Sequence, residues 1–130
     1  MNPGRNANNL KALSFLTVPL ALVGVAVYFF VLENPILYWV GTILLSFFFA
    51  QTFILLHECG HLNYFKSKAA NRFFGNIFGL LTGIPFFTWQ RMHSLHHRWT
   101  GWRDLDPTTE KTVKPIDSRI VQIIVNACWW

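Results

Sequence analysis

The sequence contains few charged residues. Asp, Glu, Lys and Arg make up only 13% of the 130 residues, whereas 52% are hydrophobic, a balance too apolar for an ordinary soluble domain of this length. Charge is absent altogether from residues 12–32 and again from residues 36–56. Each run is long enough, as a helix, to cross about 30 Å of hydrocarbon. The composition therefore predicts an integral membrane protein with two transmembrane helices, joined by a tight hairpin at Glu33, Asn34 and Pro35.

Basic residues are also absent from a long central stretch. Arg5 and Lys11 precede the first apolar run, the other nine Lys and Arg follow residue 65, and none lies between. By the positive-inside rule, both ends of the hairpin face the cytoplasm. Topology and anionic lipid account for the net charge of +5, so no nucleic-acid partner is expected. The only two cysteines, Cys59 and Cys128, lie toward the same reducing side, and we expect no disulfide.

Two shorter apolar segments follow. Residues 73–89 are uncharged but interrupted by glycines and Pro85, which predicts a re-entrant or interfacial segment, with a third short transmembrane helix as the alternative. Its aromatic residues, Phe86, Phe87 and Trp89, are typical of an interfacial belt rather than an acyl tunnel. Residues 120–130 begin like a further membrane helix that reaches only about 16 Å. The predicted fold class is therefore all-α, an integral membrane helical protein.

All five histidines lie in two clusters. The stretch HECGH carries His57 and His61 at i, i+4, just after the second apolar run, and HSLHH carries His93, His96 and His97 at i, i+3, i+4. On a helix each cluster occupies one face. Imidazole binds Fe, Zn, Cu and Ni, and five histidines exceed the three protein ligands of a catalytic zinc site. The pattern predicts a multinuclear metal centre.

HECGH also matches His-Glu-x-x-His, the zinc motif in which the glutamate, here Glu58, acts as general base. An intramembrane zinc metalloprotease of this kind would take Asp104 or Asp106 as its third ligand. That alternative leaves HSLHH without a use, so it is less favoured. Gly60, within the motif, costs about 1 kcal/mol in a helix interior relative to alanine, which indicates close packing at that point.

HECGH after an apolar hairpin, followed some 36 residues later by HSLHH and then RWTGWRDLDP, resembles the membrane fatty acid desaturase family. The resemblance covers essentially the whole chain. In that family three histidine boxes hold two irons on the cytoplasmic side of a helical membrane domain. By analogy the iron ligands here are the five histidines, His57, His61, His93, His96 and His97. Beside them, Glu58, Thr100, Asp104 and Asp106 have at most a role in orienting ligands, binding solvent or shaping the backbone.

The chain departs from the family pattern in one respect, because no histidine follows His97 and the third box is missing. Five of the family's eight box histidines are present, so we expect an N-terminal part of a desaturase that is inactive alone.

The resemblance implies that the complete protein introduces a double bond into a fatty acyl chain carried by CoA, a carrier protein or a glycerolipid. Two iron ions would use O₂ as co-substrate, and an external ferredoxin or b-type cytochrome would deliver electrons. A histidine-box hydroxylase or ketolase acting on carotenoids or alkanes remains the nearer alternative.

Overall fold

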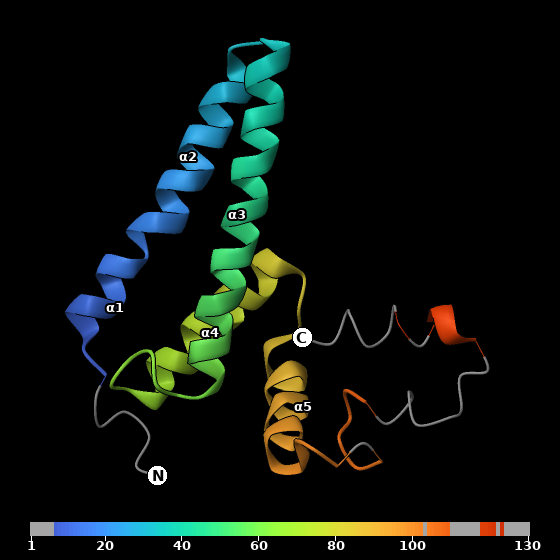
Figure 1. The fold of residues 1–130 in the computed structure, drawn as a ribbon. Helices are drawn as coiled ribbons and strands as arrows, with labels where there is room; N and C mark the ends of the chain where they lie inside the picture. The colour runs from blue at the N-terminus through green and yellow to red at the C-terminus, as the bar shows by residue number, and fades with distance from the viewer. Residues whose placement is uncertain (1–6, 103, 110–117, 122, 124–130) are drawn as a thin grey trace. The chain divides into compact units, whose positions relative to one another are not determined.

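The structure, a computed structural model, describes residues 7–102, 104–109, 118–121 and 123. Its elements are α1 (Asn9–Phe15), α2 (Thr17–Val31), α3 (Pro35–Gly60), α4 (Lys68–Thr82) and α5 (Phe86–Trp99) (Figure 1). No strand occurs among the described residues, so the all-helical prediction is confirmed for that part of the chain. The chain divides into two compact units, residues 1–90 and 91–130, and the boundary falls inside α5.

The first apolar run forms α1 and α2, which are separated only by Leu16. Asn8 caps α1, because its side-chain Oδ1 accepts hydrogen bonds from the backbone N–H groups of Leu10 and Lys11. The interruption at Leu16 has a local cause in Pro19, which lacks an N–H to donate to the carbonyl of Phe15 and whose ring crowds that carbonyl. The two helices together cover Asn9–Val31, 23 residues.

A short turn reverses the chain between α2 and α3. Glu33 adopts a left-handed conformation with φ of 50°, and the Oδ1 of Asn34 accepts hydrogen bonds from the N–H groups of Ile36 and Leu37. Pro35 occupies the first position of α3, where a missing N–H costs nothing. The predicted tight hairpin is therefore present, and α3 runs back beside α2 (Figure 1).

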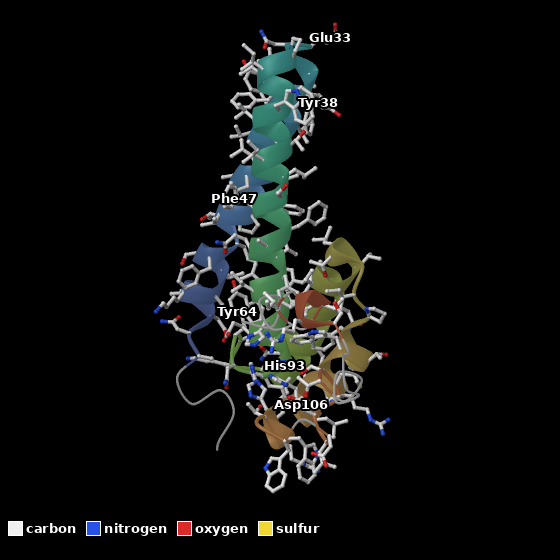
Figure 2. The ribbon with its side chains drawn as sticks, turned by 45° about the vertical axis from the view of Figure 1, so that its right-hand side comes forward. Glu33, Tyr38, Phe47, Tyr64, His93 and Asp106 are labelled. Atoms are coloured by element: carbon white, nitrogen blue, oxygen red, sulfur yellow. The ribbon has the colours of Figure 1, made fainter. Side chains whose placement is uncertain are left out.

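The hairpin leaves most of its apolar side chains uncovered. Val27, Ile43 and Phe47 are each more than half exposed, and Glu33 and Tyr64 lie near opposite ends of the hairpin (Figure 2). Asn9–Val31 and Pro35–Gly60 are the two helical stretches in the described residues that are long and apolar enough to cross a membrane. The two stretches cover nearly all of the predicted apolar runs, and α3 continues from the second run through HECG, as expected of a helix that HECGH extends.

The buried core of residues 1–90 lies at the end of α3 that carries HECGH. Leu55, Leu56 and Cys59 from α3 pack with Phe78 of α4 and with Phe86, the first residue of α5. Cys59 is a buried free thiol, and Cys128 lies outside the described residues. The end of α3 is thus the most tightly packed part of the hairpin.

The loop between α3 and α4 is built around the fully buried Asn71. Its Oδ1 accepts hydrogen bonds from the backbone N–H groups of Tyr64 and Phe65, and its Nδ2 donates to the carbonyls of Phe65 and Ser67. The hydroxyl of Tyr64 in turn donates to the carbonyl of Ala12 in α1. These bonds hold the loop that follows HECGH against both neighbouring helices.

The segment 73–89 is not one helix, and its assignment as a re-entrant or interfacial segment stays a prediction. The segment is divided between the end of α4 and the start of α5, because Gly83 ends α4 in the left-handed conformation with φ of 72° and Pro85 follows. The N–H of Ile84 donates to the carbonyl of Gly79, which closes the end of α4. α4 is not among the helices that could span a membrane.

The prediction of an interfacial belt is wrong for Phe86. Its side chain is 2% exposed and packs against Gly75 of α4, where a Cβ would lie 2.3 Å from the Phe86 ring. Phe87, by contrast, is 57% exposed. Of the predicted membrane segment 120–130, all but residues 120, 121 and 123 lie outside the described residues.

Candidate metal centre

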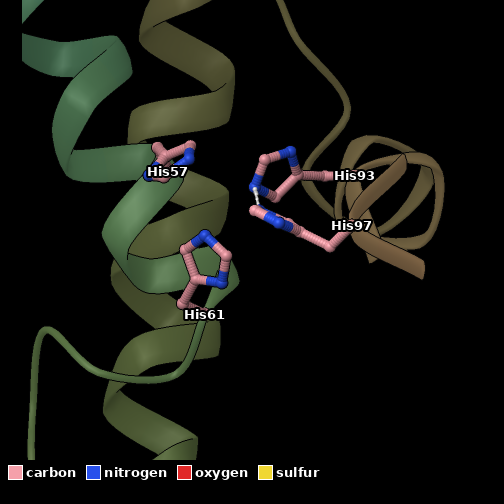
Figure 3. Close-up of side chains that lie close together, drawn as sticks. All are labelled: His57, His61, His93 and His97. Atoms are coloured by element: carbon pink, nitrogen blue, oxygen red, sulfur yellow. Dashed lines mark hydrogen bonds between the residues drawn. The ribbon is translucent and has the colours of Figure 1, made fainter. Parts of the chain in front are cut away.

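The first histidine pair lies at the end of α3. His57 is in the last turn and His61 directly follows the helix, so one helical turn separates them and brings their ring centroids to 4.6 Å (Figure 3). Both side chains are half-buried. The helical geometry expected of HECGH is therefore present, with the two imidazoles adjacent.

Glu58 contacts the first pair from the side. Its Oε1 lies 3.2 Å from Nδ1 of His57, and its side chain also lines a cavity of about 500 Å³ together with residues of α1 such as Lys11 and Phe15. When Nδ1 of His57 donates to this carboxylate, Nε2 is the nitrogen that remains for a metal. Glu58 therefore has the geometry of a group that orients a ligand.

The second cluster lies on α5, as predicted. Nε2 of His93 and Nε2 of His97 are 2.9 Å apart, and Figure 3 shows both side chains projecting from the same helix. With metal–nitrogen bonds of about 2.1 Å, nitrogens at that separation would subtend an angle of about 90° at a shared ion. The pair therefore has the spacing of two neighbouring ligands of one metal.

His96 faces a carboxylate within the same unit. Its Nδ1 lies 2.7 Å from Oδ2 of Asp106, and Asp106 is 3% exposed. The other oxygen of Asp106 accepts hydrogen bonds from the backbone N–H and the hydroxyl of Thr108. A carboxylate on Nδ1 fixes the ring of a histidine so that Nε2 is presented outward, an arrangement typical of metal ligands.

The pKa of Asp106 reflects this environment. Burial acts to raise it, but the hydrogen bonds from Thr108 and His96, together with the charge of His96, outweigh burial and leave the pKa below its usual range. Sequence reasoning did not single out Thr108. A signal for it existed, because a residue two positions after an aspartate commonly donates to that side chain in an Asx turn.

Thr100 and Asp104, the two other residues predicted beside the ligands, do not share the contact that Asp106 makes with a histidine ring. The hydroxyl of Thr100 donates to the backbone carbonyl of His96 at 2.6 Å, which is a local helix-end contact. Asp104 lies in a turn and is exposed. Of the three residues that follow the second box, Asp106 is thus the one whose side chain meets a ligand candidate.

The donor chemistry of both clusters fits a transition metal. Each offers imidazole nitrogens at one-turn spacing, and a carboxylate lies against Nδ1 of one histidine in each cluster, His57 and His96. Imidazole donors suit iron, zinc, copper and nickel, so the donor type alone does not choose among them.

Comparison with known proteins decides the family. The sequence profile of the family described as "Fatty acid desaturase" matches residues 33–125, a stretch that contains both histidine clusters. The chain belongs to the fatty acid desaturase family. This confirms the resemblance drawn from HECGH and HSLHH.

Several members of the family are similar to this chain. A "Fatty acid desaturase" of Bacillus subtilis is 39% identical over 43% of this chain and 16% of its own length. An "sn-1 oleoyl-lipid 12-desaturase" of Picosynechococcus is 26% identical over 85% of this chain and 32% of its own length. An "Omega-3 fatty acid desaturase, endoplasmic reticulum" of Vigna radiata is 36% identical over 53% of this chain and 19% of its own length. The chain thus spans less than a third of the length of these relatives, and no solved structure matches it.

Proposed function

We propose that this chain is the N-terminal part of a membrane fatty acyl desaturase in which the two histidine clusters contribute to one di-iron centre. The observation that carries the proposal is that HECGH and HSLHH, within the region that matches the family, each form a one-turn histidine pair on a helix. The relatives are named for desaturation of acyl chains, which favours this reaction over hydroxylation or ketone formation and over zinc proteolysis.

The start of α5 supports a shared centre. The ring centroid of Trp89 lies 5.9 Å from that of His57. At about 100° per residue, His93 and His97 fall about 40° and 80° around α5 from Trp89. Gln90, which donates to the carbonyl of Gly60 at the end of α3, falls about 100° from Trp89. Both histidines therefore project from the arc of α5 whose first turn contacts α3, as a centre shared with the first pair requires.

The hairpin crosses the bilayer with its N-terminus and both histidine clusters on the cytoplasmic side. Support comes from the exposed apolar surfaces of α2 and α3 and from the absence of Lys and Arg between residues 12 and 65. α4 lies in the interface, because Phe73, Ile77 and Leu80 form one exposed apolar face at i, i+4, i+7. Lys68 in its first turn meets anionic lipid headgroups.

Iron and O₂ supply an oxidant strong enough to remove hydrogen from an unactivated acyl C–H bond, and a separate ferredoxin or b-type cytochrome supplies electrons. The residues of this chain would hold the metal and orient its ligands. The five histidines are ligands, Asp106 holds His96 through Nδ1, and Glu58 holds His57 in the same way. The acyl substrate is carried by CoA, a carrier protein or a glycerolipid.

Five histidines are fewer than the eight of the family's three boxes. We therefore infer that a third box outside these 130 residues completes the centre, and that the 130-residue chain alone does not desaturate. The coverage of the relatives, less than a third of their length, supports this inference.

The test is the fatty acid profile of a host that expresses the complete reading frame together with ferredoxin and its reductase, measured by gas chromatography and mass spectrometry. We expect acyl chains with an additional double bond, absent from a His93→Ala variant and from the 130-residue chain. Hydroxylated or keto products without a new double bond would overturn desaturation and favour the hydroxylase or ketolase.

A further inference from the structure

The first turn of α5 is seated on the stripe of α3 that carries the first histidine pair. Phe53, His57 and Gly60 follow one another at i, i+4, i+7 along α3, so they share one face. The ring of Trp89 lies against all three, with its centroid 5.9 Å from the rings of Phe53 and His57. A half-buried indole therefore packs directly beside a candidate iron ligand.

Gly60 makes this approach possible. A Cβ at Gly60 would lie 2.5 Å from Cζ3 and 3.2 Å from Cη2 of Trp89, well inside van der Waals contact. The atoms it would meet belong to a ring, which cannot bend aside as the end of a flexible chain would. A side chain at position 60 must therefore push the start of α5 away from α3.

A hydrogen bond adds direction to the packing. Nε2 of Gln90 donates to the backbone carbonyl of Gly60 at 2.8 Å. The last carbonyls of a helix have no partner within the helix, so the end of α3 offers a fixed acceptor for this bond. Trp89 sets how close α5 begins, and Gln90 sets how it is rotated about its own axis.

We propose that Gly60, Trp89 and Gln90 are positioning residues that fix how close α5 begins to α3 and how it is rotated, and that metal binding by the histidines of both helices depends on this placement. This inference rests on the shared centre of the proposed function. A rotation of α5 by one residue, about 100°, would turn Trp89 away from Gly60 and would carry the second histidine pair, on the same helix, through the same angle. The three residues would touch no metal and would act only through the geometry of the ligands.

The test is Co²⁺ binding to the detergent-purified complete reading frame, followed by visible absorption, whose intensity and position report the number of bound imidazoles. Gly60→Ala should weaken Co²⁺ binding by about tenfold or more, the range typical of residues that orient ligands, and should change the absorption bands. Gly24→Ala is the matched control, because Gly24 is also helical but a Cβ there meets nothing within 4 Å. It should bind Co²⁺ as the wild type does.

Two further variants separate positioning from simple loss of folding. Phenylalanine lacks the outer ring of the indole that a Cβ at position 60 would strike, so Gly60→Ala combined with Trp89→Phe should recover part of the lost binding. Gln90→Leu, which removes the donor but keeps the size of the side chain, should alter the absorption bands while the helical circular dichroism stays at the wild-type level.

The outcomes distinguish the two proposals. If the wild type shows no Co²⁺ bands that depend on both His57 and His93, the shared centre is wrong and the positioning role falls with it. If the wild type shows those bands and Gly60→Ala and Gln90→Leu retain them unchanged, the centre stands and the positioning role alone is overturned. A Gly60→Ala protein that binds weakly and is not rescued by Trp89→Phe also contradicts the role of the Trp89 contact.

Discussion

Nδ1 of His96 and Oδ2 of Asp106 lie 2.7 Å apart, although ten residues separate them in the sequence. Asp106 is buried and is itself held by the N–H and hydroxyl of Thr108. The carboxylate therefore has one position, and it fixes one orientation of the imidazole. This relationship gives the second histidine box a preformed element that exists before any metal binds.

Replacing Asp106 tests this element. Asp106→Asn removes the charge that favours donation from Nδ1 of His96, and we expect metal affinity to fall by about 10–100-fold. Asp104→Asn is the matched control, because Asp104 is exposed and lies two residues away; its affinity should equal that of the wild type. Co²⁺ titration of both variants measures the difference, and equal affinities would show that the contact does not orient a ligand.

Asn71 supports the loop behind the first box. Asn71→Ala leaves the buried N–H groups of Tyr64 and Phe65 without their acceptor, and each such loss costs about 1–3 kcal/mol. We expect the free energy of unfolding to fall by about 3 kcal/mol or more. The comparison is Asn76→Ala on the exposed side of α4, expected within about 0.5 kcal/mol of wild type. Denaturant unfolding in detergent, followed by circular dichroism, measures both variants; a small effect at Asn71 would refute its role.

The membrane topology is testable by labelling from one side. In a chain whose native cysteines are changed to alanine, a membrane-impermeant maleimide should label the Glu33→Cys variant in intact cells. The Ala7→Cys variant should be labelled only after lysis, because the positive-inside rule places the N-terminus in the cytoplasm. Labelling of both variants from the same side would contradict a hairpin that crosses the bilayer.

The phenol of Tyr64 provides a pH test of packing around the loop. Burial raises the pKa of Tyr64 to about 12, so the folded protein favours the neutral phenol that donates to the carbonyl of Ala12. This contribution to stability is complete below the ordinary pKa of about 10 and is lost as pH rises through 12. Tyrosinate absorbance should show a transition near pH 12 that Tyr64→Phe abolishes. If the transition persists in that variant, the assignment is wrong.

Local signals in the sequence predicted the hairpin and the helical placement of both boxes. Asn34 followed by Pro35 is a cap and first-position pair, and HECGH continues an apolar run without an intervening proline. These features depend on neighbours along the chain, so the sequence alone reveals them. Gly60 likewise indicated close packing, although its partner could not be named.

Contacts between distant segments were not predictable in the same way. Phe86 was expected at the membrane interface and is buried against Gly75, because an aromatic residue has the same sequence signature in a belt and in a core. The four hydrogen bonds of Asn71 follow from how the loop folds back on α4. Asp106 was expected beside the ligands on family resemblance, but its contact with His96 needed the structure.

The central claim is that both histidine clusters serve one di-iron centre, and metal content tests it most directly. Iron and zinc per chain are measured on the detergent-purified complete reading frame, beside the 130-residue chain and a His96→Ala variant. We predict about two irons per complete chain, lost in His96→Ala and poorly retained by the 130-residue chain. One zinc per chain, unaffected by the loss of His96, would contradict a shared di-iron centre and would favour a zinc metalloprotease that uses HECGH.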